Sequence, residues 1–182
     1  GRETGGIVEG ELFYSLDMLR KQVDGLPEDL HALIEQSSQW MSALKEFDLN
    51  TLEGLAVESL EFISPIKPTK NIFCIGKNYA AHAREFDGTP PENMIVFTKA
   101  PTTVIGHGHS IPLHEEVTSE LDYEGELAVV IGKKGKGISR EEADEYIFGY
   151  TILNDITARD LQARHQQFFL GKSLDGSCPI GP

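Results

Sequence analysis

The chain has 182 residues, of which 40% are hydrophobic and 25% are charged, with a formal net charge of −13. This composition is typical of a globular protein of one domain or two small ones. The acidic balance argues against nucleic acid or an anionic membrane as a partner, since both need a basic surface, and no apolar run is long enough to cross a bilayer. Two cysteines, Cys74 and Cys178, make no disulfide framework, and the N-terminus lacks a signal-peptide pattern, so we expect a cytoplasmic protein.

Residues 1–64 have the pattern of a small α+β domain. The segment GGIVEGELFYSL alternates around a glycine, which predicts a β-hairpin. After Pro27, apolar residues recur at helical spacing, which predicts one amphipathic helix packed on the hairpin, with Trp40 in its core. The apolar residues of that helix are Leu30, Leu33, Ile34, Trp40, Met41, Leu44 and Phe47.

Residues 65–70 contain two prolines and are predicted to be a linker, and residues 71–182 form a second, β-rich region. Strands are predicted at NIFCIG, MIVFTK, TVIGHGHSIPL, the acidic segment 121–133 and YTILNDIT. A short helix is predicted to begin at Ser139, because Glu142 three residues later completes a capping box.

The acidic segment LDYEGELAVVIGK, residues 121–133, combines carboxylates with an apolar run. In a strand, Asp122, Glu124 and Glu126 share one face, where like charges repel and unpaired burial is costly. The apolar run that follows predicts a strand covered on both faces, so the carboxylates are expected to enter a covered region. The alternative is an edge strand with a solvated acidic face.

Asp155, in LNDITARD, ends an apolar strand, where packing alone does not explain a carboxylate. Together with Glu124 and Glu126 it offers only hard oxygen donors, which suit Mg²⁺, Mn²⁺ or Ca²⁺ better than zinc or copper. Three carboxylates on a divalent ion leave coordination positions for water or substrate, as a catalytic site requires.

Upstream, His82 and Glu85 in GKNYAAHAREF are one helical turn apart, so the carboxylate can orient the imidazole and raise its basicity. An exposed His–Glu pair is the alternative. Lys172, in FFLGKSLDG, stands among apolar residues and glycines, where it either extends to solvent or binds an anion.

Four segments, in this order and spacing, resemble the fumarylacetoacetate hydrolase (FAH) family, especially its acylpyruvate hydrolase and oxaloacetate decarboxylase branch: NYAAHAREF, DYEGELAVVIGK, GYTILNDITARDLQ and FFLGKSLDGSCPIGP. The resemblance runs from Asn71 to Pro182. It implies a mixed α+β, β-rich fold, in which a small α+β domain precedes the N-terminal part of an FAH-type β-sheet roll, and a homodimer. Members of the family continue with further strands, so we expect the natural protein to extend beyond Pro182.

The resemblance also implies roles for individual residues. Glu124, Glu126 and Asp155 would hold Mg²⁺ or Mn²⁺. His82 and Glu85 would form a catalytic dyad carried on a lid. Substrate would be contacted or neutralised by Arg159, Gln162 and Lys172, the last of which is also a catalytic candidate.

The implied function is that of a metal-dependent enzyme acting on a small 2-oxo acid through a metal-stabilised enolate. Oxaloacetate decarboxylation and acylpyruvate C–C hydrolysis both pass through that species. Two alternatives remain open: an isomerase of an unsaturated oxo-diacid of the hydroxymuconate type in aromatic catabolism, and a non-catalytic, metal-binding regulatory relative.

Overall fold

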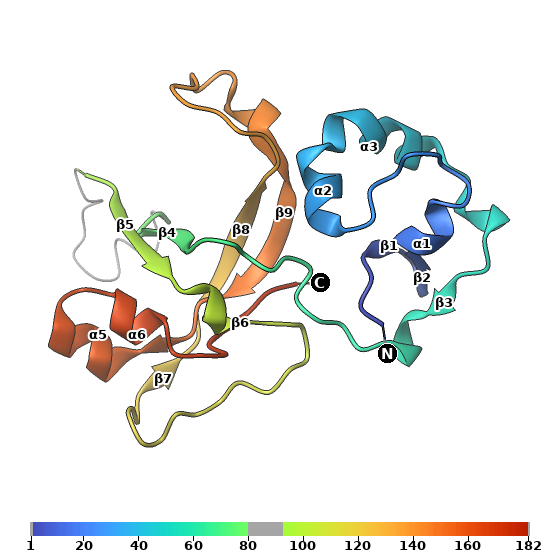
Figure 1. Cartoon of the computed structure of the whole chain (residues 1–182). Coiled ribbons are helices and arrows are strands. Elements are labelled where there is room, and N and C mark those ends of the chain that lie inside the picture. The colour runs from blue at the N-terminus through green and yellow to red at the C-terminus, as the bar shows by residue number, and fades with distance from the viewer. Residues whose placement is uncertain (1, 80–92, 182) are drawn as a thin grey trace. The chain divides into compact units, whose positions relative to one another are not determined.

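The computed structural model describes residues 2–79 and 93–181 (Figure 1). The chain divides into two compact units. The first comprises Gly1–Ile66, Leu127–Thr151 and Pro182, and the second comprises Lys67–Glu126 and Ile152–Gly181. Each unit is described separately below.

The first unit begins with the predicted hairpin, which is confirmed. Strand β1 (Gly6–Glu9) pairs antiparallel with β2 (Leu12–Ser15), and β3 (Leu55–Ala56) adds to the other edge of β2. Gly10 lies in the turn at a φ of 60°, a left-handed conformation that glycine adopts without steric cost. The turn therefore explains why a glycine interrupts the alternating pattern.

The helical part of this unit differs from the prediction of one long helix. Helix α1 (Leu16–Leu19) follows β2, and the predicted helix is divided into α2 (Leu30–Glu35) and α3 (Ser37–Glu46). Gln36 lies between them at φ −105° and ψ 16°, which is not helical. Two serines, Ser37 and Ser38, follow the break, and serine is a weaker helix former than leucine or alanine, which favours an interruption there.

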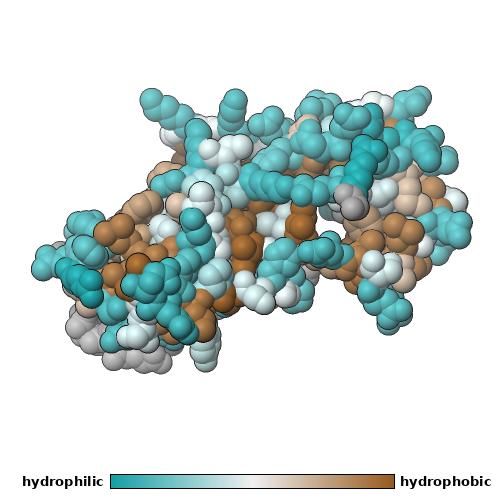
Figure 2. All heavy atoms as spheres, turned by 60° about the horizontal axis from the view of Figure 1, so that its bottom comes forward, coloured by the Kyte–Doolittle hydropathy of each residue, from teal (hydrophilic) through white to brown (hydrophobic). Residues whose placement is uncertain are grey.

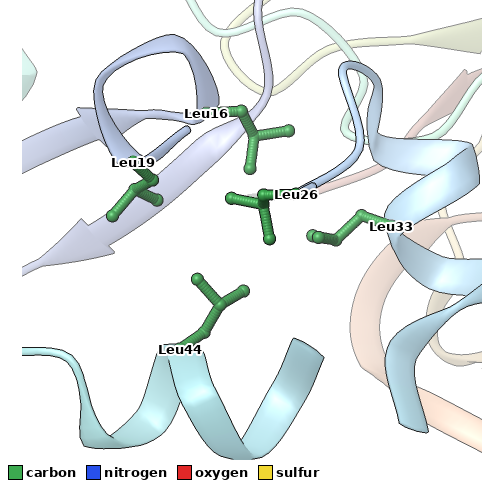
Figure 3. Close-up of a cluster of buried hydrophobic side chains, with 5 residues drawn as sticks. All are labelled: Leu16, Leu19, Leu26, Leu33 and Leu44. Atoms are coloured by element: carbon green, nitrogen blue, oxygen red, sulfur yellow. The ribbon is translucent and has the colours of Figure 1, made fainter. Parts of the chain in front are cut away.

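A cluster of buried leucines forms the core of this unit, and the side chains point toward one another (Figure 3). They come from α1, α2, α3 and the loop between α1 and α2: Leu16, Leu19, Leu26, Leu33 and Leu44. Trp40, expected in the core, is partly buried against this cluster. The burial of these apolar side chains is the main favourable term that holds the short helices in place.

The second unit is assembled from short two-stranded pairings. Antiparallel pairs join β4 (Ile72–Gly76) to β5 (Ile95–Lys99) and β7 (Leu121–Asp122) to β10 (Thr157–Ala158), and β6 (Val104–Ile105) runs parallel to β11 (Cys178–Pro179). Helices α5 (Arg159–His165) and α6 (Phe169–Lys172) lie side by side (Figure 1). A short 3-10 helix occupies Pro101–Thr103 in this unit, and those at Leu49–Thr51, Val57–Ser59 and Ala143–Tyr146 belong to the first unit.

The acidic segment is not one continuous strand. It is divided into β7 and β8 (Gly125–Ile131), with Tyr123 and Glu124 at the break, and β8 pairs with β9 (Ile147–Asn154). The expectation that its apolar run is covered on both faces is wrong for the described structure, because alternate residues Leu127, Val129 and Ile131 are exposed. Figure 2 shows apolar side chains exposed among hydrophilic ones on the face it presents.

The predicted helix at Ser139 is also wrong in type. The capping-box contacts form, since the Ser139 N–H donates to Glu142 Oε2 at 3.2 Å and the Glu142 N–H donates to Ser139 Oγ at 3.3 Å. A 3-10 helix follows instead of an α-helix, because β9 begins only five residues after Glu142 and leaves no room for further turns.

The predicted fold class, mixed α+β and rich in β-structure, is confirmed. In the described residues, no helix is long and apolar enough to span a membrane.

Replacing a leucine of the buried cluster tests the core of the first unit. Leu19→Ala leaves a cavity, and we expect it to lower the free energy of unfolding by about 2 to 5 kcal/mol. Leu55→Ala makes the same chemical change at an exposed position and is expected to cost about 0.5 kcal/mol or less. Urea unfolding measures both variants, and equal losses would contradict this assignment of the core.

Candidate active site

Two of the predicted ligand residues, Glu124 and Asp155, are brought together by backbone contacts. The Asp155 N–H donates to the Glu124 carbonyl oxygen at 2.8 Å, and the Glu124 N–H donates to Asn154 Oδ1 at 3.2 Å. The pairing of β7 with β10 fixes the same region from the other side. The break in the acidic strand therefore lies directly beside the end of β9, and both carboxylates belong to one site.

Lys172, the last residue of α6, lies between these two carboxylates. Its side chain is 2% exposed, and its Nζ lies 2.7 Å from Glu124 Oε2 and 2.7 Å from Asp155 Oδ2. The ammonium group also lies 5.1 Å from the centre of the Phe97 ring. Of the two possibilities for this lysine, extension to solvent is therefore wrong, and its charge is held inside the site.

A second buried lysine, Lys99 at the end of β5, was not identified from the sequence. Its side chain is 0% exposed, and its Nζ lies 2.9 Å from Asp155 Oδ1. This contact is an ion pair without a hydrogen bond. The signal that would have found Lys99 is the one used for Asp155: a charged residue that closes an apolar strand.

Arg159, at the start of α5, connects the first two acids of the acidic segment. Its Nε and Nη2 donate to Asp122 Oδ2 at 3.0 and 2.7 Å, and Nη2 lies 2.7 Å from Glu124 Oε1. Its Nη1 donates to Gln162 Oε1 at 3.1 Å. Thr157 Oγ1 completes the set by donating to Glu124 Oε1 at 3.2 Å. Arg159 therefore orients both Asp122 and Glu124.

These contacts determine the ionisation of the acids. Burial acts to raise the pKa of Glu124, but the hydrogen bond and charge of Lys172 and the charge of Arg159 outweigh it, so that this pKa lies below its usual value. The hydrogen bond from Arg159 likewise holds the pKa of Asp122 below its usual range. Both groups are therefore carboxylates at neutral pH and are available to cations.

The thiols are not nucleophiles at this site. Burial is the main cause that raises the pKa of Cys74 to about 12 and the pKa of Cys178 to about 11. Because the thiolate is the reactive form, a thiol with such a pKa is inert at neutral pH. Both cysteines are free.

A cavity of about 410 Å³ opens beside the charged cluster. Its polar lining includes Glu124, Glu126, Arg159, Gln162 and Lys172. On the apolar side, the rings of Phe97 and Phe168 meet edge to face with their centres 5.4 Å apart. The cavity therefore combines carboxylates, cations and an apolar wall, as small-molecule sites do.

The predicted site residues are brought together only in part. Glu124, Asp155, Arg159, Gln162 and Lys172 form one contact network, and Glu126 lines the same cavity. His82 and Glu85 lie outside the described residues. Within residues 2–79 and 93–181, no three His, Cys, Asp or Glu side chains are arranged to hold a metal ion.

The donor set nevertheless fits a divalent ion in its chemistry. Glu124 and Asp155 already converge on one cationic group, the Lys172 ammonium, which shows that both carboxylates face a position suited to positive charge. Glu126 supplies a third hard oxygen donor on the wall of the same cavity. Glu124, Glu126 and Asp155 are therefore the residues that would hold such an ion.

Neutralising Asp155 tests the charged cluster directly. Asp155→Asn removes the negative charge shared by two buried ammonium groups, so we expect the free energy of unfolding in metal-free buffer to fall by about 3 to 5 kcal/mol. Asp144→Asn is the matched control, because Asp144 is exposed. If urea unfolding finds the two variants equally stable, the ion pairs described here contribute nothing to the folded state.

Comparison with known proteins places this arrangement in a family. Residues 71–182 match the profile described as "Fumarylacetoacetate (FAA) hydrolase C-terminal". The chain is 62% identical over 130 residues to oxaloacetate tautomerase YisK of Bacillus subtilis, a match that covers 70% of this chain and 43% of the relative. The chain spans about half the length of the curated relatives it matches.

Solved structures agree in fold. A fumarylacetoacetate hydrolase from psychrophilic Exiguobacterium antarcticum is 40% identical with a TM-score of 0.78, and the match covers 97% of this chain and 60% of that one. A 5-carboxymethyl-2-hydroxymuconate delta-isomerase from Mycobacterium smegmatis is 36% identical with a TM-score of 0.60, covering 72% of this chain and 51% of that one. The resemblance drawn from the sequence motifs is confirmed, and this chain belongs to the fumarylacetoacetate hydrolase family.

Proposed function

We propose that the protein containing this chain is a divalent-metal-dependent enzyme that acts on a small 2-oxo acid, with oxaloacetate as the first candidate. The observation that carries the proposal is the buried Lys172 ammonium on the wall of the cavity, which joins Glu124 on the same wall to the buried Asp155. The high identity to a relative named as an oxaloacetate tautomerase supports the choice of substrate.

The charges around the cavity suit an anionic substrate. Three cationic side chains, Lys99, Lys172 and Arg159, face three carboxylates, Asp122, Glu124 and Asp155, so their formal charges cancel. Glu126 and Lys77, which also line the cavity, carry opposite charges that cancel, so a divalent ion would leave two net positive charges. A carboxylate substrate would therefore be attracted to this site although the whole chain carries −13.

The proposed chemistry divides between the ion and the side chains. A bound Mg²⁺ or Mn²⁺ would draw electron density from the keto oxygen of the substrate and so acidify the neighbouring carbon. Lys172, on the cavity wall, would donate a hydrogen bond to a substrate oxygen as negative charge develops there. Arg159 and Gln162 would bind the substrate carboxylate, and His82, supported by Glu85, would move the proton.

Keto–enol tautomerisation of oxaloacetate is the reaction we propose first, because it needs only this proton transfer. Decarboxylation and acylpyruvate hydrolysis require the same enolate and in addition break a C–C bond. Isomerisation of a hydroxymuconate-type diacid is the second candidate, favoured by the likeness to the Mycobacterium smegmatis isomerase. We further propose a cytoplasmic homodimer in which residues 1–64 form a separate domain.

An assay that follows both oxaloacetate species separates these reactions. The longest natural form of the protein, supplied with Mg²⁺ or Mn²⁺, is expected to speed the interconversion of enol and keto forms, measured by the ultraviolet absorbance of the enol. Coupling the product to lactate dehydrogenase detects pyruvate and hence decarboxylation. If pyruvate forms as fast as the enol disappears, the activity is decarboxylation and the proposed tautomerase activity is wrong. If neither signal changes on addition of metal, the proposal is rejected for oxaloacetate.

Two variants separate proton transfer from metal binding. His82→Ala is expected to lower the rate of acylpyruvate hydrolysis by about 10² to 10⁴, the usual loss on removal of a positioned base, and to leave Mn²⁺ affinity nearly unchanged. Oxaloacetate decarboxylation, where it occurs, needs no attacking water and should fall less. Glu124→Ala should weaken Mn²⁺ binding and damage all of these reactions together. Loss of Mn²⁺ affinity in the His82 variant would show that His82 belongs to the metal site or the fold.

A further inference from the structure

Lys99 is the most deeply buried charged residue that the proposed chemistry does not use. Its side chain is fully buried at the end of β5, and it is absent from the residues that line the cavity in the described part of the chain. It therefore touches neither substrate nor solvent, and its role must act through the groups around it.

Those groups come from two other segments of the second unit. The Lys99 Nζ lies 2.9 Å from Asp155 Oδ1, donates to the carbonyl oxygen of Ile156 at 3.2 Å, and donates to the carbonyl oxygen of Lys172 in a short hydrogen bond. Two N–H donors of the ammonium group therefore go to carbonyl oxygens, and the Asp155 carboxylate balances its charge as an ion-pair partner. Lys99 therefore connects the end of β5 to the end of β9 and to the last residue of α6.

Each contact bears on the orientation of the site. The two oxygens of Asp155 face different lysines, Oδ1 toward Lys99 and Oδ2 toward Lys172, so the carboxylate cannot rotate without losing a buried ion pair. At the same time Lys99 holds the backbone of Lys172, whose own ammonium is the second partner of Asp155. A single buried group thus constrains both ends of the Asp155–Lys172 pair.

We propose that Lys99 is a positioning residue that fixes the orientation of the Asp155 carboxylate and of Lys172, whose side chain lines the cavity. Only the reaction that Lys99 would assist rests on the proposed function, because the contacts of Lys99 with Asp155 and Lys172 are independent of that function. Residues that orient metal-binding carboxylates from behind typically contribute 10- to 100-fold to metal affinity or activity, so an effect of about that size is expected here.

The main test replaces Lys99 by methionine, which keeps the length of the side chain and removes its charge and donors. Lys136→Met is the matched control, because Lys136 is exposed in the turn after β8. In the full protein, Lys99→Met is expected to weaken Mn²⁺ binding, followed by the electron paramagnetic resonance signal of free Mn²⁺, by about 10- to 100-fold relative to the control.

A spectroscopic measurement separates positioning from simple support of the fold. In protein labelled with ¹⁵N-lysine, both buried ammonium groups should give slowly exchanging N–H signals, assigned with Lys99→Arg and Lys172→Arg. Lys99→Met should remove one signal and shift that of Lys172, whereas Lys136→Met should leave both in place. A Lys172 signal unmoved by Lys99→Met in a folded variant, with Mn²⁺ affinity equal to that of the control, would overturn the proposal.

Two further outcomes keep the test decisive. If Lys99→Met does not fold, the wild-type spectrum and the Lys99→Arg variant provide the test. Ammonium protons of Lys99 that exchange with water as fast as those of exposed lysines overturn the proposal. Slow exchange of these protons, together with a Lys172 signal that is shifted in Lys99→Arg, supports it. If the wild-type protein fails to act on oxaloacetate but the Lys172 signal still moves in Lys99→Met, the proposed function fails and the positioning role stands.

Discussion

The second unit depends on one carboxylate shared by two buried ammonium groups. Asp155 is 2% exposed, and its two oxygens face Lys99 and Lys172, which are equally inaccessible to solvent. Charges removed from water are tolerated only when they are paired and hydrogen-bonded, so none of the three can be placed until the other two are. β5, the end of β9 and α6 must therefore assemble together, and the fold of this unit cannot be separated from its site.

The interrupted acidic strand follows from the same requirement. An uninterrupted strand would direct Asp122, Glu124 and Glu126 to one face and concentrate their repulsion. The break at Glu124 instead gives the acids different sets of partners: Asp122 binds Arg159, Glu124 binds both Arg159 and Lys172, and Glu126 lines the cavity. The repulsion among the acids is thus offset by two cations, Arg159 and Lys172, which come from α5 and α6 later in the chain.

The sequence pattern predicts structure correctly where interactions between residues close in the chain determine it. The hairpin at residues 6–15 follows from alternation around Gly10, and Asp155 stood out because a carboxylate closed an apolar strand. The pattern was insufficient where partners are distant. Lys99 ends the apolar run MIVFTK, which marks it as a candidate, but a lysine at that position can equally extend to solvent. Its partners lie 56 and 73 residues further along the chain, so the sequence alone does not show that it belongs to the site. The break at Gln36 was missed for a related reason, since apolar spacing continues across it while the backbone does not.

The shared half of the site also explains how one family carries several reactions. The relatives are named as a tautomerase, a hydrolase and an isomerase, and the family profile matches residues 71–182, which contain Glu124, Asp155 and Lys172. Stabilising negative charge on a keto oxygen serves each of these chemistries equally, so the charged cluster cannot select among them. Selection must come from groups that meet the rest of the substrate. In this chain Phe97 and Phe168, packed edge to face, form the apolar wall of the cavity, so for the proposed 2-oxo acid they are the candidates for selecting its side chain.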